Sequence, residues 1–145
     1  ESMHLTLKFL GQVDVDEVAR KVWDEVAPVA VGPLALGVGR VEGFPALDRA
    51  HVVVLECDGA DARVAELAAR ADHAACRLGV PREARPFRPH VTLARSKREF
   101  DARKIAARFA PRRLGAATRL VLYESAAGRY VALAERAVSP TTPRS

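Results

Sequence analysis

The sequence predicts one mixed domain of helices and strands that is built as an internal repeat. Residues 4–7 read His-Leu-Thr-Leu, and residues 90–93 read His-Val-Thr-Leu, in a chain with four histidines. After each of these motifs the apolar pattern predicts a helix followed by two strands. A length of 145 residues fits a single domain with its own hydrophobic core.

Local patterns place the individual elements. Apolar residues at alternate positions predict strands, and apolar residues three and four apart predict helices. Asp14 and Glu17 form a capping-box pattern before the first helix. Gly37 and Gly39 indicate a bulge or a close backbone approach. In chain order, the predicted elements are a strand at 3–10, a helix at 15–30, strands at 34–41 and 51–56 forming a hairpin with a long loop, a helix at 61–78, a strand at 90–95, a helix at 101–109, and strands at 119–124 and 130–133.

The repeat is incomplete at its start. A strand and a helix precede the second motif, but nothing equivalent precedes the first. By the spacing of the repeat, we expect about forty further residues before Glu1 in the native protein. Residues 1–138 are expected to form the domain, and residues 139–145, which are rich in Pro, Ser and Thr, are expected to form a flexible tail.

Composition and charge limit the partners. The chain has no long apolar stretch and no visible signal peptide, so we expect a soluble monomer that does not contact membranes. Cys57 and Cys76 have neither metal-binding nor redox spacing, which favours a reduced, cytoplasmic protein. Residues 1–76 carry 7 Lys/Arg against 13 Asp/Glu, whereas residues 77–119 carry 13 against 3. That basic block suits a polyanion such as RNA, and a solvated basic face explains it equally well.

The paired motifs predict acid–base chemistry. Side chains alternate along a strand, so each motif places its imidazole and its hydroxyl on one face. If the two motif strands lie side by side, two imidazoles and two hydroxyls converge. Histidine changes its charge near neutral pH and can act as general acid or base, and hydroxyl groups can hold an anion. A single motif would indicate only a wet strand face; the repeat favours a site. No third ligand lies at metal-binding spacing, so neither metal nor cofactor is expected.

Three stretches carry a family resemblance: residues 4–11 (His-Leu-Thr-Leu-Lys-Phe-Leu-Gly), residues 86–95 (Pro-Phe-Arg-Pro-His-Val-Thr-Leu-Ala-Arg) and residues 122–125 (Leu-Tyr-Glu-Ser). In them the chain resembles the two-histidine phosphoesterases, and specifically the RNA 2′,3′-cyclic phosphodiesterases, also called 2′-5′ RNA ligases. The resemblance implies a bilobal α+β fold, with two antiparallel sheets related by a pseudo-two-fold axis around a central cleft and helices outside. The chain departs from the family pattern in lacking the first strand and helix, and in a short turn after Ser125.

The resemblance also implies an activity, the metal-independent hydrolysis of RNA 2′,3′-cyclic phosphate ends to 2′-phosphomonoesters. A ligase side activity is part of the same implication. Two alternatives stay open: a cyclic phosphodiesterase acting on a small nucleotide such as ADP-ribose 1″,2″-cyclic phosphate, and a nucleotide- or RNA-binding module without catalysis. The roles implied are the acid–base pair for His4 and His90, phosphate binding for Thr6 and Thr92, and binding of the terminal base for Phe9 and Arg95.

Strand geometry limits whether Phe9 and Arg95 can face the cleft. Arg95 is an odd number of positions from His90, so a regular strand would turn it to the opposite face. It reaches the cleft only if the strand ends or bulges near Ala94, and Phe9 has the same parity problem. The remaining rings are expected to lie outside the catalytic machinery. Tyr123 and Tyr130 are expected in a hairpin core, Phe44 and Phe87 in core or loop packing in preference to base stacking, and His51 and His73 in structural or exposed positions.

Overall fold

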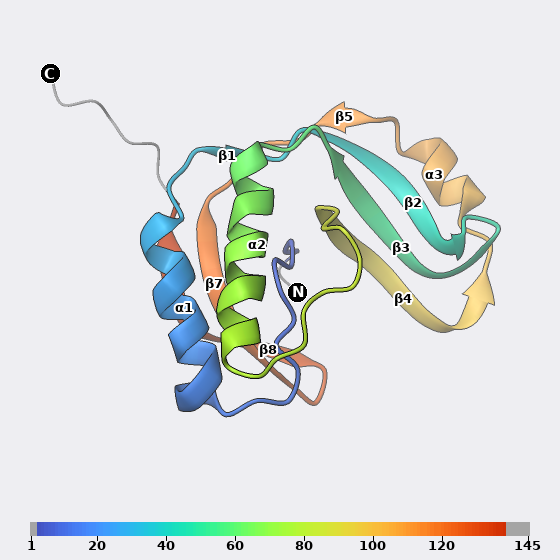
Figure 1. Cartoon of the computed structure of the whole chain (residues 1–145). Coiled ribbons are helices and arrows are strands. Elements are labelled where there is room, and N and C mark those ends of the chain that lie inside the picture. The colour runs from blue at the N-terminus through green and yellow to red at the C-terminus, as the bar shows by residue number, and fades with distance from the viewer. Residues whose placement is uncertain (1–2, 139–145) are drawn as a thin grey trace, which may run out of the picture.

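The structure, a computed structural model, describes residues 3–138 and has a mixed α+β fold (Figure 1). The tail expected at residues 139–145 lies outside the described residues. The elements in chain order are a π-helical turn Val15–Ala19, α1 Arg20–Val26, a 3-10 turn Ala27–Val29, β1 Leu34–Ala35, β2 Val38–Ala46, β3 Arg49–Asp58, α2 Ala62–Arg77, β4 His90–Phe100, α3 Arg103–Arg108, β5 Arg112–Arg113, β6 Ala116–Ala117, β7 Arg119–Ala126 and β8 Arg129–Ala137.

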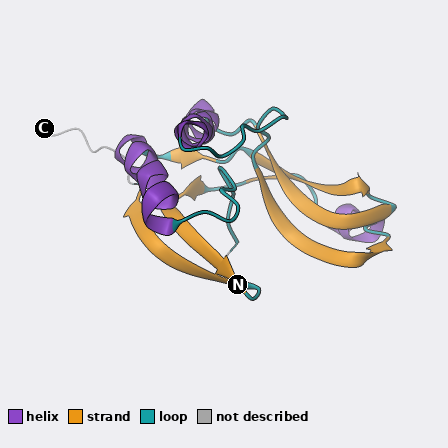
Figure 2. Cartoon of the chain, turned by 60° about the horizontal axis from the view of Figure 1, so that its bottom comes forward, coloured by secondary structure: helices purple, strands orange, loops and turns teal. Residues whose placement is uncertain are grey.

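These elements gather in two lobes, which Figures 1 and 2 show beside each other. The strand lobe is the antiparallel sheet β4-β3-β2-β5 with α3 packed against it. The helix lobe contains α1 and α2, the β7–β8 hairpin and the short β1–β6 pair. Residues 3–10 run between α2 and the loop that leads into β4 (Figure 1). The bilobal α+β fold expected from the sequence is confirmed, although the helix lobe has two separate two-stranded pieces in place of one sheet.

Each lobe draws on both halves of the repeat. The β2–β3 hairpin follows the first motif in sequence, yet β3 pairs with β4, which carries the second motif. The β7–β8 hairpin follows the second motif, yet Tyr123 and Tyr130 of this hairpin contact His4 of the first. The two halves therefore interlock, and both motifs lie where the lobes meet.

Each lobe has its own apolar core. In the helix lobe, the inward faces of α1 and α2 form a cluster on which Leu5, Leu7 and Leu10 pack. In the strand lobe, Val53 and other sheet residues pack against α3 and the residues around it. Full burial of a Leu or Val side chain stabilises by about 1.5–3 kcal/mol. The three half-buried leucines therefore fasten residues 3–10, the first motif segment, to the helix lobe.

The two longer predicted helices form, with different bounds. The segment after Asp14 begins as predicted, because the Asp14 carboxylate accepts a hydrogen bond from the Glu17 amide at 2.8 Å. It consists of three short helical pieces, and the last contains Pro28, which has no amide hydrogen to donate. The helix expected at 61–78 is α2, and Asp61 caps it by accepting from the Arg63 amide. The helix expected at 101–109 is the shorter α3.

The prediction of a strand at residues 3–10 is wrong. These residues form an irregular segment in which Leu5 makes an isolated bridge to Val91. The segment does not continue along β4, because its leucines pack on the helix lobe instead. Alternation alone could not distinguish these two environments, because both bury every second residue of a short segment.

The first hairpin also differs from expectation. The strand predicted at 34–41 divides into β1 and β2 at Gly37, whose φ is 76° and where a Cβ atom would overlap the Asp58 carbonyl oxygen. The close approach predicted from this glycine is therefore present. The long loop expected before the strand at 51–56 is absent, because β2 and β3 pair as far as Ala46 and Arg49.

Candidate active site

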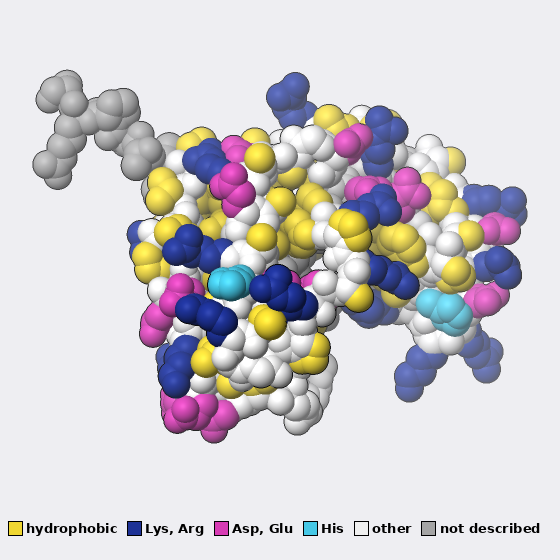
Figure 3. Space-filling model, in the orientation of Figure 1, with side chains coloured by type: hydrophobic (Ala, Val, Ile, Leu, Met, Phe, Trp, Pro, Cys, Tyr) yellow, Lys and Arg dark blue, Asp and Glu magenta, His cyan; other side chains and the backbone are white. Residues whose placement is uncertain are grey.

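A cleft of about 1230 Å³ contains both motifs in its wall. His4 and Thr6 line it from the irregular segment, and His90 and Thr92 line it from β4. Further lining comes from α2, the loop before β4 and the β7–β8 hairpin, so both lobes contribute. Figure 3 shows one face of the molecule, with Lys and Arg side chains between the two lobes. The structure thus brings together all four side chains of the two motifs.

The second motif lies at the start of β4, where the backbone ladder positions it. His90 pairs with Glu56 of β3, and Thr92 pairs with Val54. His90 Nδ1 lies 2.8 Å from the Arg88 carbonyl oxygen. A carbonyl can only accept a hydrogen bond, so Nδ1 carries the proton, and Nε2 is the accepting nitrogen of the neutral ring.

Arg88 is itself fixed beside this histidine. Its Nε donates to Glu56 Oε1 at 3.0 Å, and a second guanidinium nitrogen donates to the same oxygen. The Cys57 amide donates to the Pro89 carbonyl at 2.9 Å. Both contacts fasten the approach to β4 onto β3, which limits the positions that the His90 ring can take.

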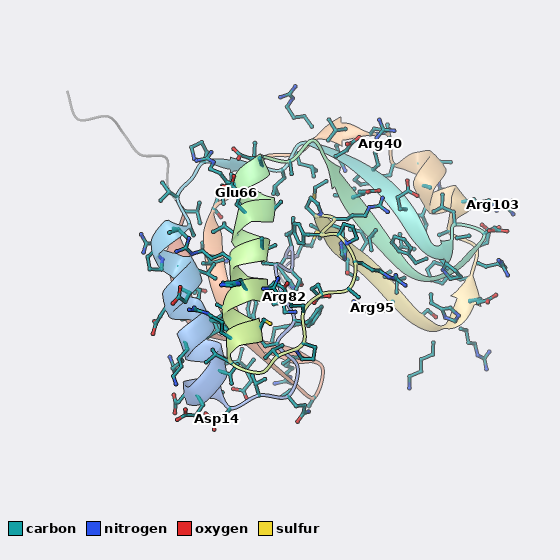
Figure 4. The ribbon with its side chains drawn as sticks, viewed as in Figure 1. Asp14, Arg40, Glu66, Arg82, Arg95 and Arg103 are labelled. Carbon is teal, nitrogen blue, oxygen red and sulfur yellow. The ribbon has the colours of Figure 1, made fainter. Side chains whose placement is uncertain are left out.

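A bulge in β4 brings Arg95 to the cleft. The ladder pairs Val54 with Thr92 and Val53 with Ala94, so Leu93 is an extra residue. Such an insertion reverses the facing of the residues that follow it. Arg95 accordingly lines the cleft, and Figure 4 shows it beside β4 near the preceding loop. Arg95 was expected to reach the cleft only if the strand ended or bulged near Ala94, and this bulge is present.

The first motif is held by side chains. Leu5 bridges to Val91, which places the residues that follow the two histidines opposite each other. The His4 ring packs between two tyrosines, with centroid distances of 5.5 Å to Tyr123 and 4.9 Å to Tyr130. Phe9 lies on the cleft wall with 62% of its surface exposed. The parity rule did not apply to Phe9, because its segment is not a strand.

The expectation that Tyr123 and Tyr130 lie in a hairpin core is wrong. Both rings line the cleft, and Tyr130 is 47% exposed. The β7–β8 ladder pairs Leu122 with Ala134 and Tyr123 with Ala132, so it skips one residue at this point. That irregularity changes which way the neighbouring side chains point, and a periodic pattern could not predict it.

Lys8 is a site residue that sequence reasoning missed. Its side chain is 4% exposed, and its ammonium lies 2.9 Å from Asp72 Oδ1 and 3.1 Å from Glu83 Oε1. Burial lowers the pKa of Lys8, but the hydrogen bonds to Asp72 and Glu83 outweigh burial and raise this pKa above its ordinary value. The hydrogen bond from Lys8 also lowers the pKa of Asp72. The only sequence signal was that Lys8 continues the period of two that begins at His4.

The cleft lining is basic. Besides Arg88 and Arg95, it contains Arg85 from the loop before β4 and Arg129 from the β7–β8 hairpin. The two carboxylates in the lining, Asp72 and Glu83, are both paired with Lys8. The arginines therefore dominate the charge that a ligand would meet.

The remaining rings singled out in the sequence take different positions. His51 Nδ1 contacts the Ser96 carbonyl at 3.1 Å, and His73 Nδ1 accepts from Arg82, which Figure 4 shows beside α2. Neither histidine lines the cleft, in agreement with their expected structural or exposed positions. Phe87 packs on the helix-lobe core as expected, and it also lines the cleft. Phe44 is 48% exposed and lies outside both apolar cores and outside the cleft lining, so a core position for it is excluded.

Residues 3–138 contain neither a metal-binding cluster nor a membrane-spanning helix. No group of three or more His, Cys, Asp or Glu side chains could hold a metal ion within this range. None of the described helices is long and apolar enough to cross a membrane. Independence from metals stays a prediction from the sequence.

Comparisons with known proteins agree on one family. A model of the 2′-5′ RNA ligase superfamily matches residues 2–129. The RNA 2′,3′-cyclic phosphodiesterase of Aeropyrum pernix is 29% identical over 97 residues, which are 67% of this chain and 54% of that relative. The matched region therefore spans about half of the curated relative's length.

Solved structures show the same fold. E. coli LigT complexed with 3′-AMP matches with a TM-score of 0.69 and 27% identity, covering 94% of this chain and 77% of that one. A crystal structure of a phosphoesterase matches with a TM-score of 0.66 and 29% identity over the same shares. A third structure, TT0787 of Thermus thermophilus, has 23% identity and a TM-score of 0.63, covers 97% of this chain and 80% of that one, and supports the fold alone.

Proposed function

The chain belongs to the 2′-5′ RNA ligase superfamily, and from this premise we propose that it hydrolyses RNA 2′,3′-cyclic phosphate ends to 2′-phosphomonoesters. The observation that carries the proposal is a single cleft lined by two histidines, each followed two residues later by a threonine. The name of the A. pernix relative, RNA 2′,3′-cyclic phosphodiesterase, supports the cyclic phosphodiesterase part of this proposal. A 2′,3′-cyclic phosphate also requires RNA, because DNA lacks the 2′-hydroxyl.

The proposed step is attack of water on phosphorus. As the new P–O bond forms, the bond from phosphorus to the ribose 3′-oxygen breaks, which leaves a 2′-phosphate and a 3′-hydroxyl. One imidazole takes the proton of the water, and the other gives a proton to the departing 3′-oxygen. Thr6 and Thr92 donate hydrogen bonds to the non-bridging oxygens, where negative charge gathers in the transition state. Phe9 and Arg95 contact the terminal base.

We assign the base role to His90 and the acid role to His4. The support for this assignment is the contact from His90 Nδ1 to the Arg88 carbonyl, which leaves Nε2 to accept a proton. His4 lies among tyrosine rings, which hold its orientation. After each turnover the two imidazoles return to their starting protonation states by exchange with solvent.

The proposal is tested by turnover of a 2′,3′-cyclic mononucleotide. His4→Ala and His90→Ala should each lower kcat by about 10²–10⁴-fold, the usual contribution of a general acid or base. His51→Ala is the matched control, because this histidine lies outside the cleft lining. A chelator should have no effect. Near-normal rates in His4→Ala or in His90→Ala would contradict the two-histidine mechanism. Binding of the nucleotide without turnover by the unmodified protein would favour a binding module without catalysis.

A small cyclic nucleotide, such as ADP-ribose 1″,2″-cyclic phosphate, is the second candidate substrate. It is favoured by the E. coli LigT structures that are complexes with ATP and with NADP+. The cleft volume of about 1230 Å³ favours RNA, because sites for single small molecules commonly enclose roughly 300–1000 Å³.

Salt dependence separates the two substrates. If the arginine-lined cleft follows an RNA backbone through about four phosphates, affinity for an oligonucleotide should fall roughly 50-fold between 50 and 200 mM salt. Affinity for a mononucleotide should fall much less. Equal salt slopes for the two ligands would assign the basic block to a solvated face.

A further inference from the structure

Lys8 makes contacts that join three separate segments of the chain. Its ammonium contacts Asp72 Oδ1 of α2 at 2.9 Å. It also donates to the Pro81 carbonyl and to Glu83 Oε1, each at 3.1 Å, in the loop before β4. The Glu83 amide in turn donates to Asp72 Oδ1 at 3.1 Å. We call these four residues the lysine hub.

The hub occupies all the donors of the lysine. An ammonium has three hydrogens, and three acceptors surround this one within 3.1 Å. A substrate phosphate would therefore have to displace an existing partner to bind Lys8 directly. The geometry favours a structural task for the charge over direct contact with the ligand.

The position of the hub defines that task. Lys8 lies two residues after Thr6, and the loop that it contacts ends at His90. The segment that carries the first motif has one backbone bridge to β4, at Leu5, and no further strand pairing in the range 3–10. Its register against β4 beyond that bridge must come from side-chain contacts, among which the hub is the most polar and directional.

Burying the lysine charge is a costly way to gain stability. The Lys8 side chain is 4% exposed, whereas those of Asp72 and Glu83 are 19% and 57% exposed. Removing an ammonium from water costs several kcal/mol, and an apolar residue of similar volume often stabilises as well or better. A cluster of this kind is therefore better explained by the geometry that it imposes. In a site that needs two imidazoles on opposite sides of one phosphate, an error of about 1 Å can cost 10²-fold in rate.

We propose that Lys8 is a positioning residue, which sets His4 and Thr6 against His90 and Thr92 by joining the first motif segment to α2 and to the loop before β4. The proposal deepens the function proposed above and rests on it. It assigns Asp72 and Glu83, the carboxylates of the cleft lining, to the same positioning task.

The test compares Lys8→Met with Lys8→Arg and with Lys21→Met. The control residue Lys21 forms an exposed helical pair with Glu17, the two side chains being 55% and 76% exposed. Turnover of a 2′,3′-cyclic mononucleotide is measured well below the melting temperature of every variant, and hydrogen exchange is followed over residues 3–10. Lys8→Met should lower kcat by about 10–100-fold, change KM less than about threefold, and speed exchange in residues 3–10. Lys8→Arg should recover part of kcat, and Lys21→Met should match the unmodified protein.

Several outcomes would overturn the proposal. Unchanged kcat in Lys8→Met would do so, as would a rise in KM alone, which would indicate a direct phosphate ligand. If Lys8→Met does not fold, Asp72→Ala takes its place, because it removes the oxygen that contacts the Lys8 ammonium and accepts from the Glu83 amide. It should lower kcat with little change in KM, and an unaffected kcat there counts equally against the hub. Absence of turnover in the unmodified protein would instead contradict the proposed function. In that case hydrogen exchange alone tests the positioning role, and unchanged exchange of residues 3–10 in Lys8→Met would overturn it.

Discussion

The two His-x-Thr motifs have nearly the same sequence but are held in different ways. The second lies in β4, where backbone pairing with β3 begins at His90 itself. The first lies in an irregular segment with a single bridge at Leu5. Packing of its leucines on the helix lobe and the ion pairs of Lys8 replace the missing ladder.

This difference shows that a strand is not required to present the motif. A backbone ladder fixes successive residues at once, because each hydrogen bond is supported by its neighbours in the sheet. Side-chain contacts fix single points, and the ionic contacts among them depend on pH. The first motif should therefore respond more strongly than the second to changes in its surroundings. The following experiments test that asymmetry.

The largest effect should come from changing the leaving group. An aryl phosphodiester releases a phenolate that needs no proton, so it no longer requires a general acid. His4→Ala should then recover most of the activity, about 10²–10⁴-fold, that it loses with a cyclic phosphate, whereas His90→Ala should stay inactive with both substrates. Steady-state rates of the two variants on both substrates make the comparison. The opposite pattern would exchange the two roles.

A smaller effect is expected from the threonines. Thr6→Val and Thr92→Val each remove a hydroxyl that faces the cleft, and loss of one such donor typically lowers kcat by about 10²–10³-fold. Thr118→Val is the control, because Thr118 lies outside the cleft lining. Similar losses for both variants would show that the two motifs hold the phosphate equally. A loss below about tenfold at Thr6 would show that the first motif does not contact the phosphate closely.

The smallest effect concerns stability in acid. The hydrogen bond from Lys8 lowers the pKa of Asp72, so this carboxylate stabilises the fold above its unfolded pKa near 4, and the stabilisation is lost as the pH falls through the folded pKa. Asp72→Asn should lower the free energy of unfolding by about 1–3 kcal/mol at pH 7. The difference from the unmodified protein should shrink below about pH 4. Urea denaturation at pH 7, 5 and 3 measures it, with Asp16→Asn as an exposed control. A difference that does not vary with pH would contradict the ionic origin.

Part of the site could be selected from the sequence alone. His4, Thr6, His90 and Thr92 stood out because the same short motif occurs twice, and the structure places all four in one cleft. The elements predicted most closely, such as α2 and the core of β3, are those whose periodic burial extends over several residues. Repetition and periodicity are properties of the chain as written, so they need no knowledge of distant contacts.

Other features depended on the tertiary structure. The bulge at Leu93 turns Arg95 into the cleft, and the irregular β7–β8 ladder accompanies the placement of Tyr123 and Tyr130 in the cleft wall. The hub buries Lys8. The hub partners Pro81 and Glu83 lie 73 and 75 positions from Lys8. The sequence determined which chemical groups the protein has and their local periodicity. Folding decided which of them meet, because contacts between residues so far apart depend on how helices and sheets pack together and not on the pattern around either residue.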